Sequence, residues 1–189
     1  WYSTFASLMY DTFDESYFPT KGYRLTLDTR YVFDGYSIFL EDDGVEEGVS
    51  YEGDVPPYSV GTVSLSGVLP IGERFVIQPT VHAGWMTEYP GHMDFIHILS
   101  AGGTRAGRYV ENQIPFFGFS NGFRTYLRYA ATTSVDFRYM INHKNFLTLR
   151  AGSFHNDDVL KDLWQKKPSA YAFGAEIGQR SVAGPMRLG

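Results

Sequence analysis

The fold is decided by residues 126–154, which read YLRYAATTSVDFRYMINHKNFLTLRAGSF. Apolar and aromatic side chains occupy almost every second position of the first half, and small, polar or charged side chains lie between them. The first set is Leu127, Tyr129, Ala131, Thr133, Val135, Phe137, Tyr139 and Ile141. This period of two is typical of a β-strand and holds for about fifteen residues, against about five or six in a soluble strand.

A tight polar turn, Asn142-His-Lys-Asn145, follows this run. The alternation then resumes, with Leu147 and Leu149 on one face and Thr148 and Arg150 on the other. The two runs predict a long β-hairpin that has one apolar and one polar face. Such a hairpin needs a different solvent on each side, and hydrocarbon outside with a watery lumen inside supplies both. The stretch therefore predicts a transmembrane β-barrel.

The composition favours an all-β chain and excludes several classes of site. The chain has 189 residues, enough for one sizeable domain, and its 14 Tyr and 15 Phe favour strands. A net charge of −5 gives no basic surface for nucleic acid, and the absence of Cys excludes disulfides, thiolate metal sites and thiol nucleophiles. No apolar run approaches the length of a membrane helix, which a barrel does not need because lumen-facing residues interrupt its strands.

Alternation of the same kind predicts further strands along the whole chain. They cover residues 1–10, 23–33, 59–69, 74–86 and 170–179, and another begins at Met186. Pro79 lies on the apolar face of its strand, where it removes a ladder hydrogen bond, so we expect a bulge or a local distortion there. Residues 35–57 read as a long, solvated acidic loop, and no ligand spacing supports a cation site in it.

The connections alternate between short and long. The short ones are 70–73, 142–145 and 180–185, and the long ones are 35–57, 87–124 and 155–167. Outer-membrane barrels have short turns on the periplasmic side and long loops outside. The strand order then places the intermediate turn 11–22 on the periplasmic side. Because both ends of the sequence fall in predicted strands, we expect residues 1–189 to be a partial C-terminal outer-membrane β-barrel domain, truncated at both ends.

Three motifs resemble the BamA-like outer-membrane barrel superfamily, the bacterial surface antigen barrels. Asp11-Thr-Phe-Asp14 with Tyr17-Phe18-Pro19-Thr20-Lys-Gly22 is similar to its D-x-x-D … F-P-T-x-G turn, which we expect on the periplasmic side. Ser181-Val-Ala-Gly-Pro-Met186 is similar to its P-x-G-P-(L/I) turn. Ala101-Gly102-Gly103 and Gly107-Arg108-Tyr109 lie where its inward-folded sixth loop carries R-G-(F/Y), although here the Gly precedes the Arg. The order and spacing match over nearly the full chain.

The resemblance implies an antiparallel transmembrane β-barrel of sixteen strands in the bacterial outer membrane, of which this chain holds about eight. The segments 103–109 and 113–118 look more like the barrel attached to patatin-like phospholipases. That branch implies an anchor, and also an exporter, for a lipase domain that lies outside this sequence. The first alternative is a BamA- or TamA-like factor for assembly or translocation of outer-membrane proteins. A soluble β-sandwich that acts as a binding module is a further alternative.

The polar face carries the candidate site residues. We expect Arg108, with Tyr109 beside it, to reach into the lumen and pair with Asp136 or Glu176, because a bidentate Arg–carboxylate pair would hold the loop there. A surface Arg in a mobile loop is the alternative. Arg150 occupies the position where the insertase members of the superfamily place an Asp. The glycines at 102, 103 and 107 belong to the same loop.

No catalytic, cofactor or metal site is predicted in this chain. Gly118-Phe-Ser-Asn-Gly122 matches G-x-S-x-G, but a nucleophile elbow needs a strand before the Ser and a helix after it, and a strand follows here. His92 and His97 have poor metal spacing. The expected partners are outer-membrane lipids together with periplasmic and lipase domains of the same chain. Nucleic acid is not an expected partner, and the sequence makes no prediction of oligomeric state.

Overall fold

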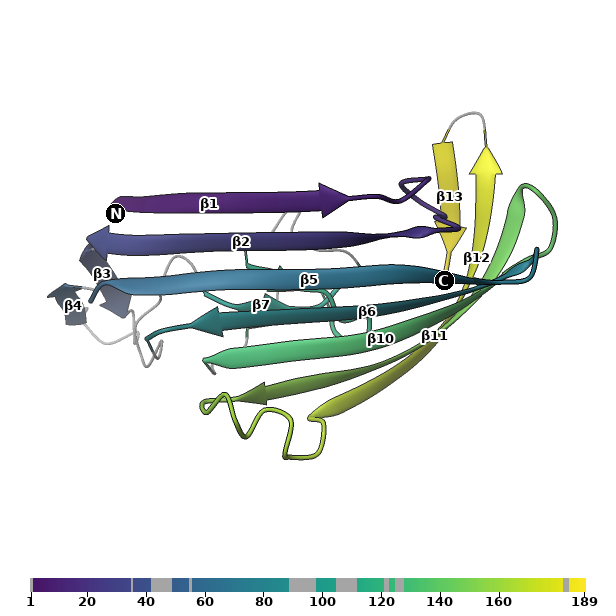
Figure 1. The fold of residues 1–189 in the computed structure, drawn as a ribbon. Coiled ribbons are helices and arrows are strands. Elements are labelled where there is room, and N and C mark those ends of the chain that lie inside the picture. The colour runs from purple at the N-terminus through teal and green to yellow at the C-terminus, as the bar shows by residue number, and fades with distance from the viewer. Residues whose placement is uncertain are drawn as a thin grey trace.

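Eight antiparallel strands form one curved sheet in the computed structural model of the chain (Figure 1). Their order is β1 (Tyr2–Asp11), β2 (Gly22–Asp34), β5 (Tyr58–Ile71), β6 (Phe75–Met86), β10 (Tyr129–Met140), β11 (Asn145–Asp157), β12 (Ala170–Ser181) and β13 (Gly184–Leu188). The structure describes every residue except 1, 35, 42–48, 55, 89–97, 105–111, 121–122, 125–127 and 182–183. The prediction of an all-β, antiparallel fold with about eight wall strands is confirmed.

The two faces of this sheet have the polarity that the alternation predicts. On the outer face, Leu65, Leu149 and Phe173 are 52%, 52% and 81% exposed. On the inner face, Arg138 is 6% and Thr148 is 3% exposed. A water-soluble protein buries its apolar side chains, so this inverted arrangement fits a wall with lipid outside and a polar lumen inside.

The short turns gather at one end of the sheet and the long connections at the other. In Figure 1 the turns after β1, β5 and β10 lie on the right, where β12 and β13 also approach the β1–β2 turn. This arrangement agrees with the predicted periplasmic and extracellular ends. Among the described residues, no helix is long and apolar enough to cross a bilayer.

Pro79 interrupts one ladder without shifting it. The β5–β6 pairing runs from Val60↔Met86 to Ser66↔Thr80 and resumes at Leu69↔Ile77 in the same register. On the other side of β6, Pro79 stays paired with Val135 of β10. Of the two expected alternatives, a bulge or a local distortion, the structure has the distortion, a gap of two pairs, because the loss of one N–H does not require an extra residue.

Two of the long connections contain strands that the sequence did not predict. Residues 35–57 include an antiparallel hairpin, β3 (Tyr36–Glu41) and β4 (Val49–Asp54), where we expected only a solvated loop. Residues 87–124 include a small sheet of β7 (Ser100–Ala101), β8 (Gln113–Ile114) and β9 (Phe123–Arg124). The central strand β7 pairs in parallel with β8 and antiparallel with β9.

Candidate functional site

The lumen is occupied from both ends by segments of the chain. We call residues 12–21, the turn between β1 and β2, the turn insert, and residues 98–124 the loop insert. The loop insert contains β7, β8 and β9 and contacts the wall at β6 and β10 through β8. Each insert is built from a motif that the sequence analysis singled out.

Asp14 organises the turn insert. Its Oδ1 accepts hydrogen bonds from the amides of Thr20 (2.8 Å) and Lys21 (3.2 Å), and its Oδ2 accepts one from the Thr20 hydroxyl. Desolvation by itself raises the pKa of the Asp14 carboxyl, but these hydrogen bonds outweigh it and hold the pKa below its usual value. Gly22 closes the turn at φ 102°, with an ideal Cβ only 2.3 Å from the Thr12 carbonyl oxygen, so only glycine fits there.

At the start of the turn, Asp11 holds the ends of the two strands together. Its Oδ2 accepts hydrogen bonds from Arg24 Nε (2.9 Å) and Nη2 (2.6 Å), and its Oδ1 accepts one from the Phe13 amide (3.0 Å). The D-x-x-D … F-P-T-x-G pattern thus describes a turn in which two carboxylates and one glycine fix the backbone.

Phe18 is the residue of the turn insert that packs against the inner face of the wall. The side chain is 2% exposed and stacks on Phe146 of β11, with ring centroids 4.5 Å apart and planes at 12°. The ring sits over Gly178 of β12, where an ideal Cβ would lie 2.6 Å from a ring carbon. The guanidinium groups of Arg187 and Arg138 lie 5.0 and 5.8 Å from the ring centroid. The phenyl ring is therefore enclosed by β10, β11, β12 and β13.

Arginines of the wall hold the backbone on either side of Phe18. Arg138 Nη1 donates to the Pro19 carbonyl (2.8 Å), 119 residues away in sequence, and Arg138 Nη2 donates to Gln78 Oε1 (2.6 Å). Arg187 Nη2 donates to the Tyr17 carbonyl (2.6 Å). These contacts attach the turn insert, which follows β1, to β10 and β13 on the opposite part of the sheet.

Arg180 adds an ion pair at the edge of the turn insert. Its Nη2 lies 2.6 Å from Glu15 Oε2, and both side chains remain partly exposed. A pair of this exposure contributes little to stability, so the buried contacts of Phe18 and Arg138 are the main attachment of the turn insert.

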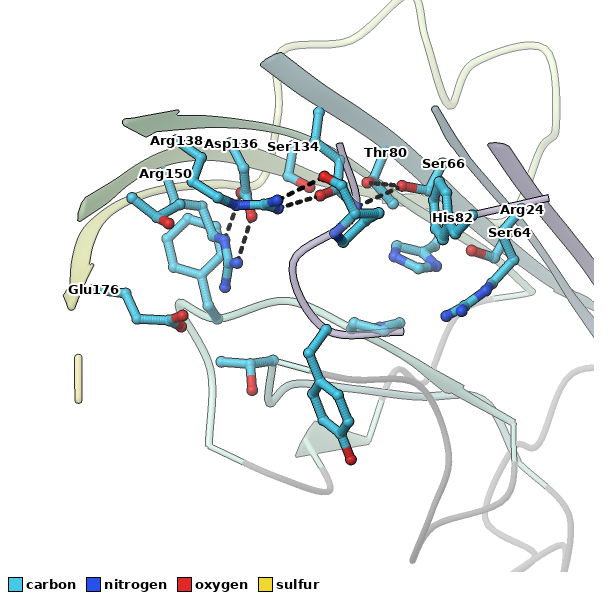
Figure 2. A pocket seen from close by; sticks show the side chains of 18 of the residues that line it. Arg24, Ser64, Ser66, Thr80, His82, Ser134, Asp136, Arg138, Arg150 and Glu176 are labelled. Atoms are coloured by element: carbon cyan, nitrogen blue, oxygen red, sulfur yellow. Dashed lines mark hydrogen bonds and ion pairs between the residues drawn. The ribbon is translucent and has the colours of Figure 1, made fainter. Parts of the chain in front are cut away.

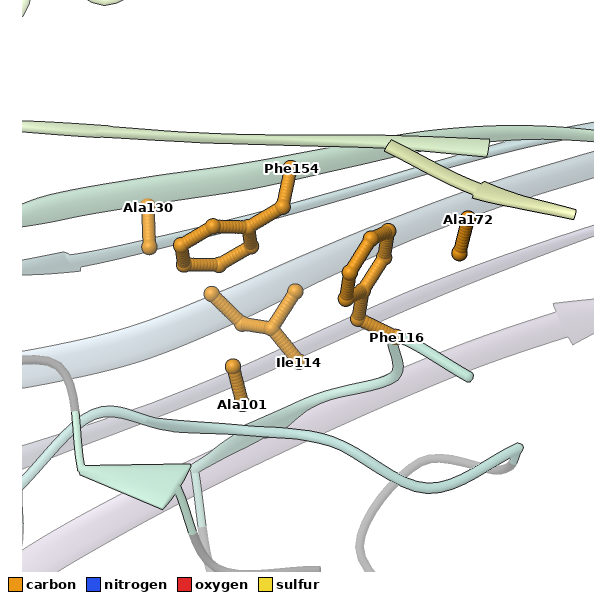
Figure 3. Packing of buried hydrophobic residues seen from close by; sticks show 6 residues of the cluster. All are labelled: Ala101, Ile114, Phe116, Ala130, Phe154 and Ala172. Carbon is orange, nitrogen blue, oxygen red and sulfur yellow. The ribbon is translucent and has the colours of Figure 1, made fainter. Parts of the chain in front are cut away.

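Apolar packing holds the loop insert. Ala101, Ile114 and Phe116 of the loop are at most 2% exposed and form one cluster with residues of the wall (Figure 3). The wall residues are Ala130, Phe154 and Ala172. Phe116 and Phe154 lie 5.6 Å apart between ring centroids. A hydrogen bond of 3.0 Å from Thr132 Oγ1 to the Pro115 carbonyl joins this core.

A cavity of about 570 Å³ lies between the two inserts and the wall (Figure 2). Asp136 and Arg150 form a bidentate pair on its surface, with Nε–Oδ1 and Nη2–Oδ2 distances of 2.6 and 2.5 Å. The Arg150 guanidinium also lies 5.5 Å from the centroid of the Phe117 ring. Glu176 faces the same cavity, 3.4 Å from Arg187. The cavity lining therefore holds both signs of charge beside aromatic side chains of the inserts.

The expected loop latch lies outside the described residues, since Gly107, Arg108 and Tyr109 belong to 105–111. Its two candidate acceptors, Asp136 and Glu176, face the lumen as predicted, and each holds another arginine. The latch stays a prediction. Gly102 and Gly103 adopt positive φ angles of 122° and 70°.

The chemical motifs that the sequence analysis discounted are placed as follows. Ser120 of the G-x-S-x-G match is exposed in a non-helical segment. His92 and His97 lie outside the described residues. Among the residues that the structure describes, no group of three or more His, Asp or Glu side chains is arranged to hold a metal ion.

A family model for the OMP85 superfamily matches residues 1–189, the whole chain. The chain belongs to the OMP85 superfamily. Its members are bacterial outer-membrane proteins, which agrees with the apolar outer face of the sheet. The predicted superfamily and the predicted location in the outer membrane are confirmed. No curated protein matches the chain significantly.

Four residues of this OMP85 barrel that hold the turn insert were not predicted from the sequence. They are Phe146, Arg138, Arg180 and Arg187. Arg138 falls between the apolar positions of the alternating run, which predicts the lumen face for it, but nothing in the local pattern pointed to its partner. The available signal was the apolar Phe18 inside a polar turn, which needs a buried site somewhere in the fold.

Proposed function

We propose that this OMP85 barrel is the membrane anchor, and a route of export, for a patatin-like lipase domain of the same polypeptide. The observation that carries the proposal is the occupation of the lumen from both ends by packed inserts. An anchor needs a stable wall and no open channel in its resting state. Phe18 and Phe116, each 2% exposed, fix one insert each to that wall.

The pairing of Arg150 supports the same choice. Arg150 stands where insertase members of the superfamily are expected to carry an Asp, and it holds Asp136 through two hydrogen bonds. An Asp at this position could form an ion pair with an arginine of the loop insert such as Arg108, whereas Arg150 cannot. The resemblance of segments 103–109 and 113–118 to barrels of patatin-like phospholipases is the second support.

Assembly or translocation of outer-membrane proteins is the second candidate, and membership of the OMP85 superfamily favours it. Such a factor works on other barrels, whereas an anchor works on its own polypeptide. The two functions therefore predict different losses when the protein is removed or shortened.

The test uses the complete gene product in its own outer membrane. An anchored lipase gives phospholipase activity in the membrane fraction, and deletion of the barrel moves that activity into the soluble fraction. A matched variant with an intact barrel and a deleted soluble region keeps the barrel in the membrane and loses the activity. A full-length protein without phospholipase activity, whose depletion lowers the amount of other β-barrel proteins, overturns the anchor and establishes the assembly factor.

A further inference from the structure

A short chain of hydrogen bonds lies on the lipid-facing wall near the extracellular ends of β10 and β11. Thr133 Oγ1 lies 2.8 Å from Ser153 Oγ, which lies 3.1 Å from His155 Nε2. Ser153 and His155 flank Phe154, which points into the lumen and is 1% exposed. Because side chains of a strand alternate between faces, these three polar groups point outward.

This polar cluster interrupts an apolar surface. Thr133 pairs with Val81 of β6 and Ser153 pairs with Tyr171 of β12, and these neighbours are 41% and 66% exposed. Polar groups that face hydrocarbon are costly unless they find partners. The hydrogen bonds within the cluster leave one polar atom unpaired, because His155 Nδ1 is buried and has no partner among the described residues.

From the length of β11, we expect the cluster near the depth where headgroups meet acyl chains. Ser153 precedes the end of β11 at Asp157 by four residues, which is roughly 10 Å along the membrane normal for a tilted strand. Tyr129 of β10 pairs with Trp85 of β6 and with Asp157 at the same end of the wall. Aromatic residues of this kind form the girdle of a barrel at the membrane interface.

The β11–β12 loop, residues 158–169, folds back over this part of the wall. Its Trp164 ring lies 4.9 Å from the His155 ring between centroids, and the indole is still 51% exposed. Lys166 Nζ binds Asp157 Oδ2 at 2.5 Å, and the Ser169 amide donates to the Phe154 carbonyl at 2.8 Å. The exposed indole therefore stands beside the polar cluster and not in open solvent above the barrel.

The loop combines exposed apolar and cationic side chains. Val159 and Leu160 are 44% and 59% exposed, next to the exposed Lys161. Lys161 and Lys167 make no ion pair within the described part of the chain, whereas Lys166 Nζ lies 2.5 Å from Asp157 Oδ2 and 3.8 Å from Asp162 Oδ2. Apolar side chains with free ammonium groups are typical of a segment that lies at a membrane surface.

We propose that Thr133, Ser153, His155 and Trp164 form a binding site for the phosphate-bearing headgroup of an outer-leaflet lipid, with Lys161 and Lys167 attracting its charge. The hydroxyls of Thr133 and Ser153 offer hydrogen-bond donors to phosphate and ester oxygens, and His155 Nε2 holds the Ser153 hydroxyl in place. Trp164, Val159 and Leu160 lie against the glycerol and the upper acyl chain. The site continues the lipid-facing surface of the barrel, so a lipid is the occupant that reaches it by lateral diffusion alone.

The same contacts favour binding over hydrolysis. A Ser–His pair acts as a nucleophile when a third group orients the imidazole and when donors stabilise the oxyanion. Within the described residues His155 Nδ1 faces no carboxylate. The backbone amides of β11 near Ser153 take part in its two ladders. The pair therefore serves as a recognition element.

The test is lipid retention by the full-length protein in nanodiscs of equal parts phosphatidylglycerol and phosphatidylcholine. Native mass spectrometry after detergent exchange counts the lipids that remain bound. We expect the wild type to retain phosphatidylglycerol preferentially, and Lys161→Gln and Lys167→Gln each to lower that preference about fivefold. Lys144→Gln, in the exposed periplasmic turn, is the matched control and leaves the preference unchanged.

A second variant separates the headgroup contact from the lysines. His155→Phe keeps a ring against Trp164 and removes both nitrogens, so we expect fewer retained phosphatidylglycerol molecules and an unchanged shift in gel mobility on heating, which reports an intact barrel. Equal retention of the two lipids by the wild type overturns the proposal. The same holds if the Lys161, Lys167 and His155 variants all match Lys144→Gln. Neither result bears on lipase anchoring, which is measured by enzyme activity.

Discussion

The two inserts fill one lumen by opposite means. The loop insert enters from the extracellular end, has its own small sheet, and buries a continuous apolar cluster against β10, β11 and β12. The turn insert enters from the periplasmic end and depends on one phenyl ring and on guanidinium groups that bind backbone carbonyls. Both inserts attach to the polar inner face of the wall, but only the apolar packing of the loop insert resembles the core of a soluble protein.

A wet lumen places a different requirement on each insert. A long segment can bury enough of its own apolar surface to exclude water, so it needs few contacts with the charged residues of the wall. A turn of ten residues cannot, and the carbonyls that it buries against the wall must find donors there. The wall supplies those donors as arginines, which carry several N–H groups in a fixed geometry.

Loss of Phe116 gives the largest expected effect. Phe116→Ala removes a buried side chain, 2% exposed, at the centre of the loop cluster. We expect the free energy of unfolding, measured in urea, to fall by about 3 kcal/mol. The loop insert also becomes sensitive to protease between residues 98 and 124. Phe173→Ala, on the outer face and 81% exposed, is the control. A loop insert that resists protease in the Phe116 variant contradicts apolar packing as its attachment.

Loss of Arg138 comes next and acts on the other insert. Arg138→Met keeps most of the side-chain volume but leaves the Pro19 carbonyl and Gln78 Oε1 without their donor, and we expect a loss of about 2 kcal/mol. Protease then cuts within residues 12–21 while the loop insert stays protected. Arg24→Met breaks a partly exposed pair with Asp11 and serves as the control, with a loss below about 1 kcal/mol. Equal losses for the two variants would remove the distinction between buried and exposed arginines.

Acid gives the smallest expected effect, confined to the turn insert. The pKa of Asp14 is lowered in the folded protein, so its contribution to stability is present above the ordinary aspartate pKa and is lost as pH falls through the lower folded value. Below that pH we expect faster amide exchange at Thr20 and Lys21, whose N–H groups bind the carboxylate. Asp14→Asn is the control and removes most of the pH dependence. Equal acceleration in the loop insert would indicate global unfolding instead.

The wall of the barrel was predictable from the sequence, but the contents of the lumen were only partly so. Alternation identifies a strand and its two faces from neighbouring residues alone, and Phe137 and Arg138 face lipid and lumen as that pattern requires. Pairing between consecutive strands follows from the short turns. The superfamily motifs also predicted that the loop insert folds into the lumen, but they did not predict which wall residues it contacts.

The missing information concerned contacts between distant segments. Arg138 and Pro19 are far apart in sequence, and no local period relates them. The hairpin at 36–54 was missed for another reason, since its acidic composition matches that of a solvated loop. Asp136 or Glu176 was expected to pair with Arg108, and the structure places Arg150 beside Asp136 and Arg187 beside Glu176, pairs that the sequence did not predict.

The reach of the turn insert has a consequence for the order in which the sheet is completed. Glu15 and Tyr17 lie near the start of the chain, and their partners Arg180 and Arg187 lie near the last residues described. Contacts of such long sequence separation form late, because the intervening chain must be ordered first. Of the turns described here, the turn insert is therefore the last to dock, and its docking reports that the strands between Glu15 and Arg187 have paired.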